Sequence, residues 1–329
     1  MAAGEIVPSP TINEVAESAK RAAARIAELV RETPLDYSPK FSEETGAEVW
    51  FKLENLQHTG SFKLRGAVNR LMTLSPERQA AGCVAASSGN HGAAVAYAMN
   101  KLGVQGVIFV PEQTSPTKVA AIRSYGGDAR FFGTDGLDTE LHAREYAEQN
   151  AMFYLSPYND EEVMAGQGSC GVEIAAQLPD VDDVFIAIGG GGLISGVGSV
   201  LRQHNKKVRV IGCQPSASAV MTRSVEAGEI LDLPSEPTLS DGTAGGIEPG
   251  AITFDLCRAV VDDYVLVDEE QIAAAMRLYM DSEHQMIEGA AGVAIAGMLA
   301  QKEELAGRNV VILVCGANIS RATLLSVIS

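Results

Sequence analysis

The chain is short of basic residues: its 329 residues include 25 Lys and Arg against 42 Asp and Glu, a formal net charge of −17. A surface this acidic repels phosphate backbones and anionic headgroups, so we expect neither a nucleic-acid partner nor a membrane partner. No apolar run approaches the roughly 18 residues that a membrane helix needs. Residues 1–10 combine no basic stretch with an apolar one, so we expect no secretory signal.

Cysteine and histidine are also scarce, with five of each. The cysteines are odd in number, widely spaced and form no Cys-x-x-Cys pair, which favours reduced thiols and a cytoplasmic location over a disulfide framework. The histidines show none of the spacings typical of metal ligands. We therefore expect no metal site.

What the chain has is a hydrophobic fraction of 46% and 33 glycines, typical of a globular protein. Its length favours two lobes over one core. Apolar strand-like runs alternate with helical patterns, which predicts an α/β fold with buried, open, parallel sheets in two domains. We place the large domain at 1–80 and 156–329, and the small domain at 81–155. The predicted strands are 49–53, 82–87, 107–110, 129–132, 152–155, 184–188, 208–212, 264–267 and 310–314. The predicted helices include 15–31, 116–125, 163–178 and 217–227.

One lysine stands in an unusual setting. Lys63 follows Phe62 within the segment Gly60–Gly66, which reads GSFKLRG. Apolar neighbours favour a desolvated amine with a lowered pKa, which suits a Schiff-base lysine that also takes the Cα proton of an amino acid. A solvated lysine at a helix start is the alternative. The flanking glycines and Phe62 favour the functional interpretation.

Four consecutive glycines, Gly189, Gly190, Gly191 and Gly192, follow an apolar run. Bare backbone N–H groups at the start of a helix attract a phosphate dianion, whereas a tight turn alone rarely needs four glycines. The dinucleotide motif G-x-G-x-x-G does not fit, because Ser195 stands at its last position. A phosphate cradle beside a reactive lysine is typical of pyridoxal 5'-phosphate enzymes.

A polar loop lies between the lysine and the glycines and reads SSGNHG. Its hydroxyl, amide and N-terminal N–H groups suit the α-carboxylate of a substrate, so Ser87, Ser88, Asn90 and His91 are candidate substrate-binding residues. Asn90 could also bind the phenolic oxygen of the cofactor. Helix capping by serine or asparagine, and core packing by histidine, explain each residue taken alone equally well.

Cys315 ends the last apolar run and is followed by Gly316, Ala317 and Asn318. Its thiol is a weak donor that could face the pyridine nitrogen of the cofactor. From the residue alone, a small buried apolar side chain is the favoured interpretation.

With these segments assembled, the chain resembles fold-type II pyridoxal-phosphate enzymes of the serine/threonine dehydratase and serine racemase family. The resemblance runs from Ala23 to the C-terminus. Within the family, the middle and C-terminal parts of the chain are similar to hydroxyectoine-utilisation and hydroxyaspartate ammonia-lyases. It implies two open twisted parallel-sheet domains like those of the tryptophan synthase β-subunit, with pyridoxal 5'-phosphate between them. The segments that carry it are 60–66, 87–92, 165–168, 189–193, 288–292 and 315–318.

The resemblance also implies roles for single residues. Phe62 packs against the cofactor ring, Asn90 binds its phenolic oxygen, and Leu193 joins the glycines at the phosphate. Ser88 matches the serine that is the second acid/base of racemases, where many threonine dehydratases have alanine. Cys315 departs from the pattern, since the partner of the pyridine nitrogen is usually serine.

A second departure concerns the metal site of the racemases. That site uses a glutamate and an aspartate where this chain has Gln214 and Val220. The resemblance therefore gives no support for a bound divalent cation.

Together these patterns predict a cytoplasmic, homodimeric enzyme that uses pyridoxal 5'-phosphate. We expect an ammonia-lyase (dehydratase) that converts a β-hydroxy-α-amino acid to a 2-oxo acid and ammonia, with Lys63 and Ser88 as catalytic candidates. Threonine and serine lead as substrates, with 3-hydroxyaspartate a further candidate. An amino-acid racemase is the alternative. A non-catalytic ligand-binding protein on the same scaffold is a third hypothesis, which the intact Lys63 argues against.

Overall fold

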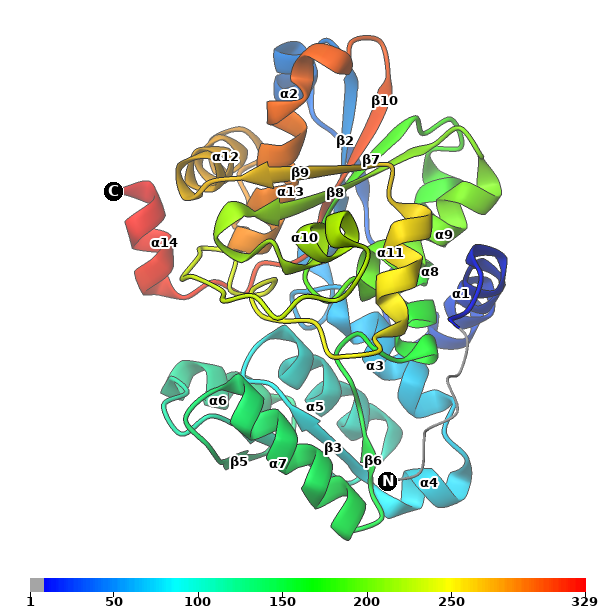
Figure 1. Cartoon of the computed structure of the whole chain (residues 1–329), viewed down its shortest axis with the longest axis vertical. Coiled ribbons are helices and arrows are strands. Elements are labelled where there is room, and N and C mark those ends of the chain that lie inside the picture. Colours follow the sequence, from blue (N-terminus) through cyan, green and yellow to red (C-terminus); the bar gives the residue numbers. More distant parts are fainter. Residues whose placement is uncertain (1–8) are drawn as a thin grey trace.

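The computed structural model describes residues 9–329. Within this range the strands form two sheets (Figure 1). The larger sheet has six strands in the order β1-β2-β10-β7-β8-β9, and every neighbouring pair is parallel except β1 with β2. Its strands are β1 (Leu35–Tyr37), β2 (Glu48–Leu53), β7 (Asp183–Ala187), β8 (Arg209–Pro215), β9 (Asp263–Val267) and β10 (Asn309–Val314).

The smaller sheet has four strands, all parallel, in the order β5-β4-β3-β6. It lies with α5, α6 and α7 in the lower part of Figure 1, below the larger sheet. Its strands are β3 (Cys83–Ala86), β4 (Gly106–Val110), β5 (Asp128–Phe131) and β6 (Phe153–Tyr154).

Helices separate the strands and pack on the sheets. The α-helices are α1 (Ile12–Ile26), α2 (Pro39–Thr45), α3 (Lys63–Met72), α4 (Pro76–Ala81), α5 (Asn90–Leu102), α6 (Pro116–Ser124), α7 (Gly136–Gln149), α8 (Glu161–Gln177), α9 (Gly192–His204), α10 (Val220–Ala227), α11 (Ile252–Val260), α12 (Glu269–Glu283), α13 (Gly289–Ala300) and α14 (Arg321–Ile328). Short 3-10 turns are η1 (Glu54–Leu56), η2 (Ser216–Ser218) and η3 (Lys302–Glu304). No helix of residues 9–329 has both the length and the apolar character to cross a bilayer.

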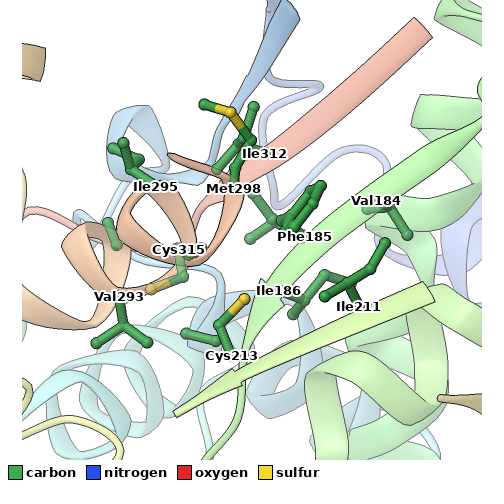
Figure 2. Packing of buried hydrophobic residues seen from close by; sticks show 14 of the residues in the cluster. Val184, Phe185, Ile186, Ile211, Cys213, Val293, Ile295, Met298, Ile312 and Cys315 are labelled. Carbon is green, nitrogen blue, oxygen red and sulfur yellow. The ribbon is translucent and has the colours of Figure 1, made fainter. Parts of the chain in front are cut away.

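The core of the larger sheet is formed by its central strands and α13. Phe185 of β7 pairs in register with Ile312 of β10, and Figure 2 shows Met298 of α13 on the side of Phe185. Ile186, the next residue of β7, points the other way, toward Ile211 of β8. These strands are apolar at successive positions because a parallel sheet is buried on both faces. The rigid sheet that results fixes where the strand ends emerge.

The predicted α/β class with two sheets is confirmed, and the predicted strands lie within three residues of the observed ones. Three details were wrong. Thr11 forms a capping box with Glu14, so α1 begins at Ile12, and it ends at Ile26 instead of residue 31. The helix predicted from residue 217 begins only at Val220, after a 3-10 turn. Strand β1 pairs antiparallel with β2, so the larger sheet is not wholly parallel.

The division into domains at 80/81 and 155/156 remains a prediction. Helix α3, which precedes the first of these limits, packs through Leu64, Val68 and Leu71 into the core that also holds Val95 of α5 and Ile108 of β4. The polypeptide before residue 80 therefore contributes apolar side chains to the smaller sheet's core.

Candidate functional site

The candidate residues surround one cavity of about 1080 Å³, at the upper end of the range for small-molecule sites. It lies where the carboxyl ends of β3, β7 and β10 meet, the usual position for ligands in open α/β sheets. Its walls include every site residue named from the sequence: Phe62, Lys63, Ser87, Ser88, Asn90, His91, Gly189, Gly190, Gly191, Gly192, Leu193 and Cys315.

The segment that carries Lys63 is joined to the end of β10 by backbone hydrogen bonds. The N–H of Phe62 donates to the carbonyl of Cys315 at 3.1 Å, and the N–H of Ala317 donates to the carbonyl of Gly60 at 2.9 Å. Gly60 has a φ of 72°, in the left-handed region that favours glycine. These bonds fix the start of α3 against a strand of the rigid sheet.

Lys63 is the first residue of α3 and its amine is enclosed. Its Nζ donates to the carbonyl of Pro157 at 2.9 Å and lies 5.2 Å from the centroid of the Phe62 ring. Burial lowers the pKa of Lys63 to about 8, while Cys315 and Glu288 act in the opposite direction. A good part of the amine is therefore neutral, and nucleophilic, near physiological pH.

The four glycines form the turn between β7 and α9. Backbone N–H groups from Gly189 through Leu193 donate to no backbone or side-chain acceptor within residues 9–329. A row of unpaired N–H groups at a helix start is an anion-binding arrangement. A Cβ on Gly190 would lie 2.4 Å from the ring of Tyr158, and Gly191 has φ 85°, so both positions require glycine.

The polar loop links β3 to α5. Gly89 is the N-cap residue of α5, so no side chain caps the start of this helix, and Asn90 is the first helical residue. The Ser87 hydroxyl accepts the N–H of Gly89 at 3.2 Å. Capping therefore does not account for Asn90, whose side chain bonds to Glu288 instead.

His91 is buried and its ring is already occupied. Its Nε2 lies 3.0 Å from the carbonyl of Leu155, a pair in which only the nitrogen can donate. Burial lowers the pKa of His91 to about 3, with the nearby Lys63 charge contributing, so the ring is neutral. Its free Nδ1 then carries no proton, and only the backbone N–H of His91 is left to donate to a carboxylate.

Glu288 is a site residue to which our sequence analysis assigned no role. It is 4% exposed and accepts Asn90 Nδ2 at 2.9 Å on both carboxylate oxygens and the N–H of Asn318 at 3.2 Å. The Cys315 thiol lies 3.8 Å from its Oε1. One feature of the sequence could have identified it: Glu288 stands directly before the apolar, small-residue segment that forms α13. An acidic residue that is buried beside such a segment needs a hydrogen-bonding partner.

Cys315 is 2% exposed and its thiol stays protonated, because burial raises its pKa well above the ordinary value, with Glu288 adding to the effect. Gln214, in the place of a racemase metal ligand, has its amide occupied by Thr222 and the carbonyl of Ile188. Within residues 9–329 no cluster of His, Cys, Asp and Glu has the composition of a metal site.

These groups fit pyridoxal 5'-phosphate. The cavity offers a buried amine of lowered pKa for the aldehyde, the unpaired N–H groups of Gly189 to Leu193 for the phosphate, and the amide of Asn90 for a phenolic oxygen. The neutral thiol of Cys315 can donate to a ring nitrogen. The donor set matches the cofactor that the sequence predicts.

Comparison with known families agrees with this fit. The profile of the family described as "Pyridoxal-phosphate dependent enzyme" matches residues 26–316. Among curated proteins, the chain is 39% identical to the L-threonine ammonia-lyase of Geobacter sulfurreducens, over 91% of this chain and 74% of that protein. It is 36% identical to the L-threonine dehydratase catabolic TdcB of Escherichia coli, over 94% of this chain and 93% of that protein.

Solved structures give the same picture. The processed form of threonine deaminase isoform 2 from Solanum lycopersicum has a TM-score of 0.92 and 33% identity, covering 99% of this chain and 97% of that one. Maize serine racemase has a TM-score of 0.90 and 31% identity, covering 95% of this chain and 96% of that one. The fold is therefore shared by proteins named as deaminases and by proteins named as racemases.

Proposed function

The chain belongs to the family of pyridoxal-phosphate dependent enzymes, and from this premise we propose that it is an ammonia-lyase of the threonine/serine dehydratase type. It converts a β-hydroxy-α-amino acid to a 2-oxo acid and ammonia. The observation that carries the proposal is one cavity that holds the buried Lys63 amine, the N–H row of Gly189 to Leu193 and the start of α5. Its similarity to proteins named L-threonine ammonia-lyase supports the same reaction.

Bound pyridoxal 5'-phosphate supplies an aldehyde for amines and an electron-withdrawing ring that acidifies Cα. With the cofactor bound, Lys63 Nζ would hold its aldehyde, and the same amine would accept the Cα proton of the substrate. Its pKa of about 8 suits this task, since a base works best with a pKa near the operating pH. The Pro157 carbonyl orients the amine before it reacts.

The start of α5 holds the substrate carboxylate. The hydroxyl of Ser88 and the backbone N–H groups of Asn90 and His91 lie at a helix N-terminus, where the macrodipole favours an anion. The β-hydroxyl departs and, with the proton that Lys63 took from Cα, makes one water. The enamine that results takes up a water and releases ammonia, which leaves the 2-oxo acid. The neutral thiol of Cys315 would face the ring nitrogen of the cofactor as a weak donor and would add no positive charge to it.

The substrate is tested by ammonia and 2-oxo acid release from the stereoisomers of threonine, serine and 3-hydroxyaspartate. Threonine and serine are the substrates we propose. 3-Hydroxyaspartate stays in the panel because the cavity wall also includes Arg321, whose guanidinium is a partner for a second carboxylate, and Lys118, which pairs with Asp241. Failure of every β-hydroxy amino acid to release ammonia would refute the proposed reaction.

The pH dependence of cofactor uptake follows from the pKa of Lys63. The neutral amine attacks the aldehyde, and burial makes it available around pH 8 instead of near the ~10.4 of a free lysine. We expect the rate at which cofactor-free protein takes up pyridoxal 5'-phosphate to rise with pH, with a midpoint near 8, in stopped-flow absorbance. A midpoint near that of free lysine would show that Lys63 is not the reacting amine.

Racemisation is the second candidate function, because Ser88 lines the cavity and a serine racemase shares the fold. A racemase needs an acid/base on the second face of Cα, whereas elimination needs only Lys63. Ser88→Ala should abolish racemisation of serine, while elimination from one enantiomer survives with kcat/KM lower by roughly 10- to 100-fold, because a hydrogen bond to the carboxylate is lost.

Chiral analysis of serine alongside ammonia release measures both activities. Ser87→Ala is the matched control, since the Ser87 hydroxyl is engaged by Gly89, and it should keep any racemisation. Persistent racemisation in Ser88→Ala would remove Ser88 from the reaction. Racemisation faster than elimination in the wild type would reverse the order of the two functions.

We also propose a homodimer, a cytoplasmic location, and the domain division 1–80 with 156–329 against 81–155. The dimer rests on the family resemblance and on exposed apolar side chains such as Leu325 and Ile328 of α14. The location rests on five free cysteines. Light scattering of the purified protein tests the homodimer. Limited proteolysis near residues 80 and 155 tests the domain division.

A further inference from the structure

Glu288 is a buried carboxylate whose place in the cavity wall calls for a function. It is the N-cap residue of α13, yet its side chain forms no cap bond to that helix. The carboxylate is instead pressed against Gly316, where a Cβ would lie 2.6 Å from Oε1 and 2.9 Å from Oε2. A side chain on residue 316 would displace it. The local backbone is thus built to admit this carboxylate, and helix capping does not explain its presence.

The contacts of Glu288 are all with donors. Asn90 Nδ2 and the N–H of Asn318 donate to it, and the Cys315 thiol lies within reach. Burial raises the pKa of Glu288 to about 7, with Asp241 adding to the rise, while the bonds from Asn90, Asn318 and Cys315 oppose it. Since a protonated carboxyl would find no acceptor among these contacts, the ionised form is the one that the surroundings bind.

The amide of Asn90 is held at both ends. Its Oδ1 accepts Asn318 Nδ2 at 2.6 Å, and Asn318 Nδ2 also donates to the carbonyl of Thr59 at 2.9 Å. Its Nδ2 faces both oxygens of Glu288 at 2.9 Å. The two N–H bonds of the Asn90 amide point in directions about 120° apart, whereas the two oxygens of the Glu288 carboxylate lie close together. Both oxygens therefore share one N–H, and the other N–H of Nδ2 remains for a ligand.

We propose that Glu288 is a positioning residue: its carboxylate fixes the Asn90 amide so that the remaining Nδ2–H is presented to the cavity as a donor. That donor suits the ionised phenolic oxygen of pyridoxal 5'-phosphate, so the inference rests on the proposed function of the cavity. Glu288 acts through Asn90 and takes part in no proton transfer.

The test compares cofactor binding by cofactor-free variants at about pH 8, above the pKa of Glu288. In Glu288→Gln, one carboxylate oxygen becomes an NH₂ group. This NH₂ would face the N–H donors that now bind Glu288, so Asn90 loses one hydrogen bond and its fixed position. We expect the dissociation constant for pyridoxal 5'-phosphate, from absorbance titration, to rise roughly 10- to 100-fold. The pH at which the visible band of the bound cofactor changes should also rise, since an ionised phenolic oxygen loses a donor.

The double variant Asn90→Asp/Glu288→Gln separates positioning from stability. It retains the total charge and a hydrogen bond between the two side chains, now donated by Gln to Asp, but it presents no N–H to the cavity. We expect it to melt near the wild-type temperature and still to bind the cofactor weakly. Asp183→Asn is the control for loss of a buried carboxylate, because Asp183 pairs with Arg308 at the other end of β7. It should lower thermal stability and leave the dissociation constant within about twofold.

Wild-type affinity in Glu288→Gln, or restored affinity in the double variant, would overturn the inference. Both results would leave the proposed function standing, provided that the wild type binds the cofactor. A wild-type protein that binds no pyridoxal 5'-phosphate would instead refute the proposed function itself.

Discussion

Lys63→Ala is expected to lower ammonia release from the best substrate by at least about 10⁴-fold, because one side chain supplies both the amine for the cofactor and the base for Cα. The side chain is half-buried at the cavity wall, and Nζ has only the Pro157 carbonyl as a hydrogen-bond partner within residues 9–329. Removing it should therefore cost activity much more than stability. Steady-state ammonia release and thermal melting of the same preparations provide the two readouts.

Lys101→Ala is the matched control, because Lys101 is exposed at the last turn of α5. It should retain wild-type activity. Small primary amines added to Lys63→Ala should restore part of the rate, since they can fill the space and accept the proton. Wild-type turnover in Lys63→Ala would place the reacting amine on another residue.

Gly190→Ala is expected to weaken binding of pyridoxal 5'-phosphate by roughly 10- to 100-fold. The new methyl group would lie 2.4 to 2.6 Å from ring atoms of Tyr158, so the loop or the ring must move. Overpacking of this kind typically costs about 1–3 kcal/mol, which corresponds to that range in the dissociation constant. Displacement of the loop misaligns the N–H groups that face the phosphate.

The comparison with pyridoxal, which lacks the phosphate, makes this result specific. The wild type should bind pyridoxal 5'-phosphate much more tightly than pyridoxal, and Gly190→Ala should lose most of that preference. Gly246→Ala is the matched control, since a Cβ there meets nothing within 4 Å, and it should leave both affinities unchanged. An unaltered preference in Gly190→Ala would mean that the phosphate binds elsewhere.

The sequence was informative about the strands because a buried parallel strand must be apolar along its length. Runs such as those ending at Ala187 and Val314 therefore stood out, and so did the glycines that follow the first of them. Helix limits were less predictable. The end of α1 at Ile26 depends on contacts with distant segments that no local pattern records.

The site was predictable where chemistry requires a residue type, as at Lys63 and the glycines. Glu288 was missed as a functional residue because its importance depends on Asn90, which lies 198 positions away in the chain. The protonation of the His91 ring could not be predicted from the sequence either. Only the Leu155 carbonyl beside Nε2 shows that its ring has no proton to offer a carboxylate.

The central claim is that Lys63 holds pyridoxal 5'-phosphate in the cavity between the two sheets. The most direct measurement is reduction of the cofactor-loaded protein with borohydride, followed by peptide mass spectrometry. The account predicts a cofactor adduct on the peptide that contains Lys63, with loss of the visible band and of activity in step. An adduct on any other lysine, or bound cofactor that leaves no adduct, would contradict it.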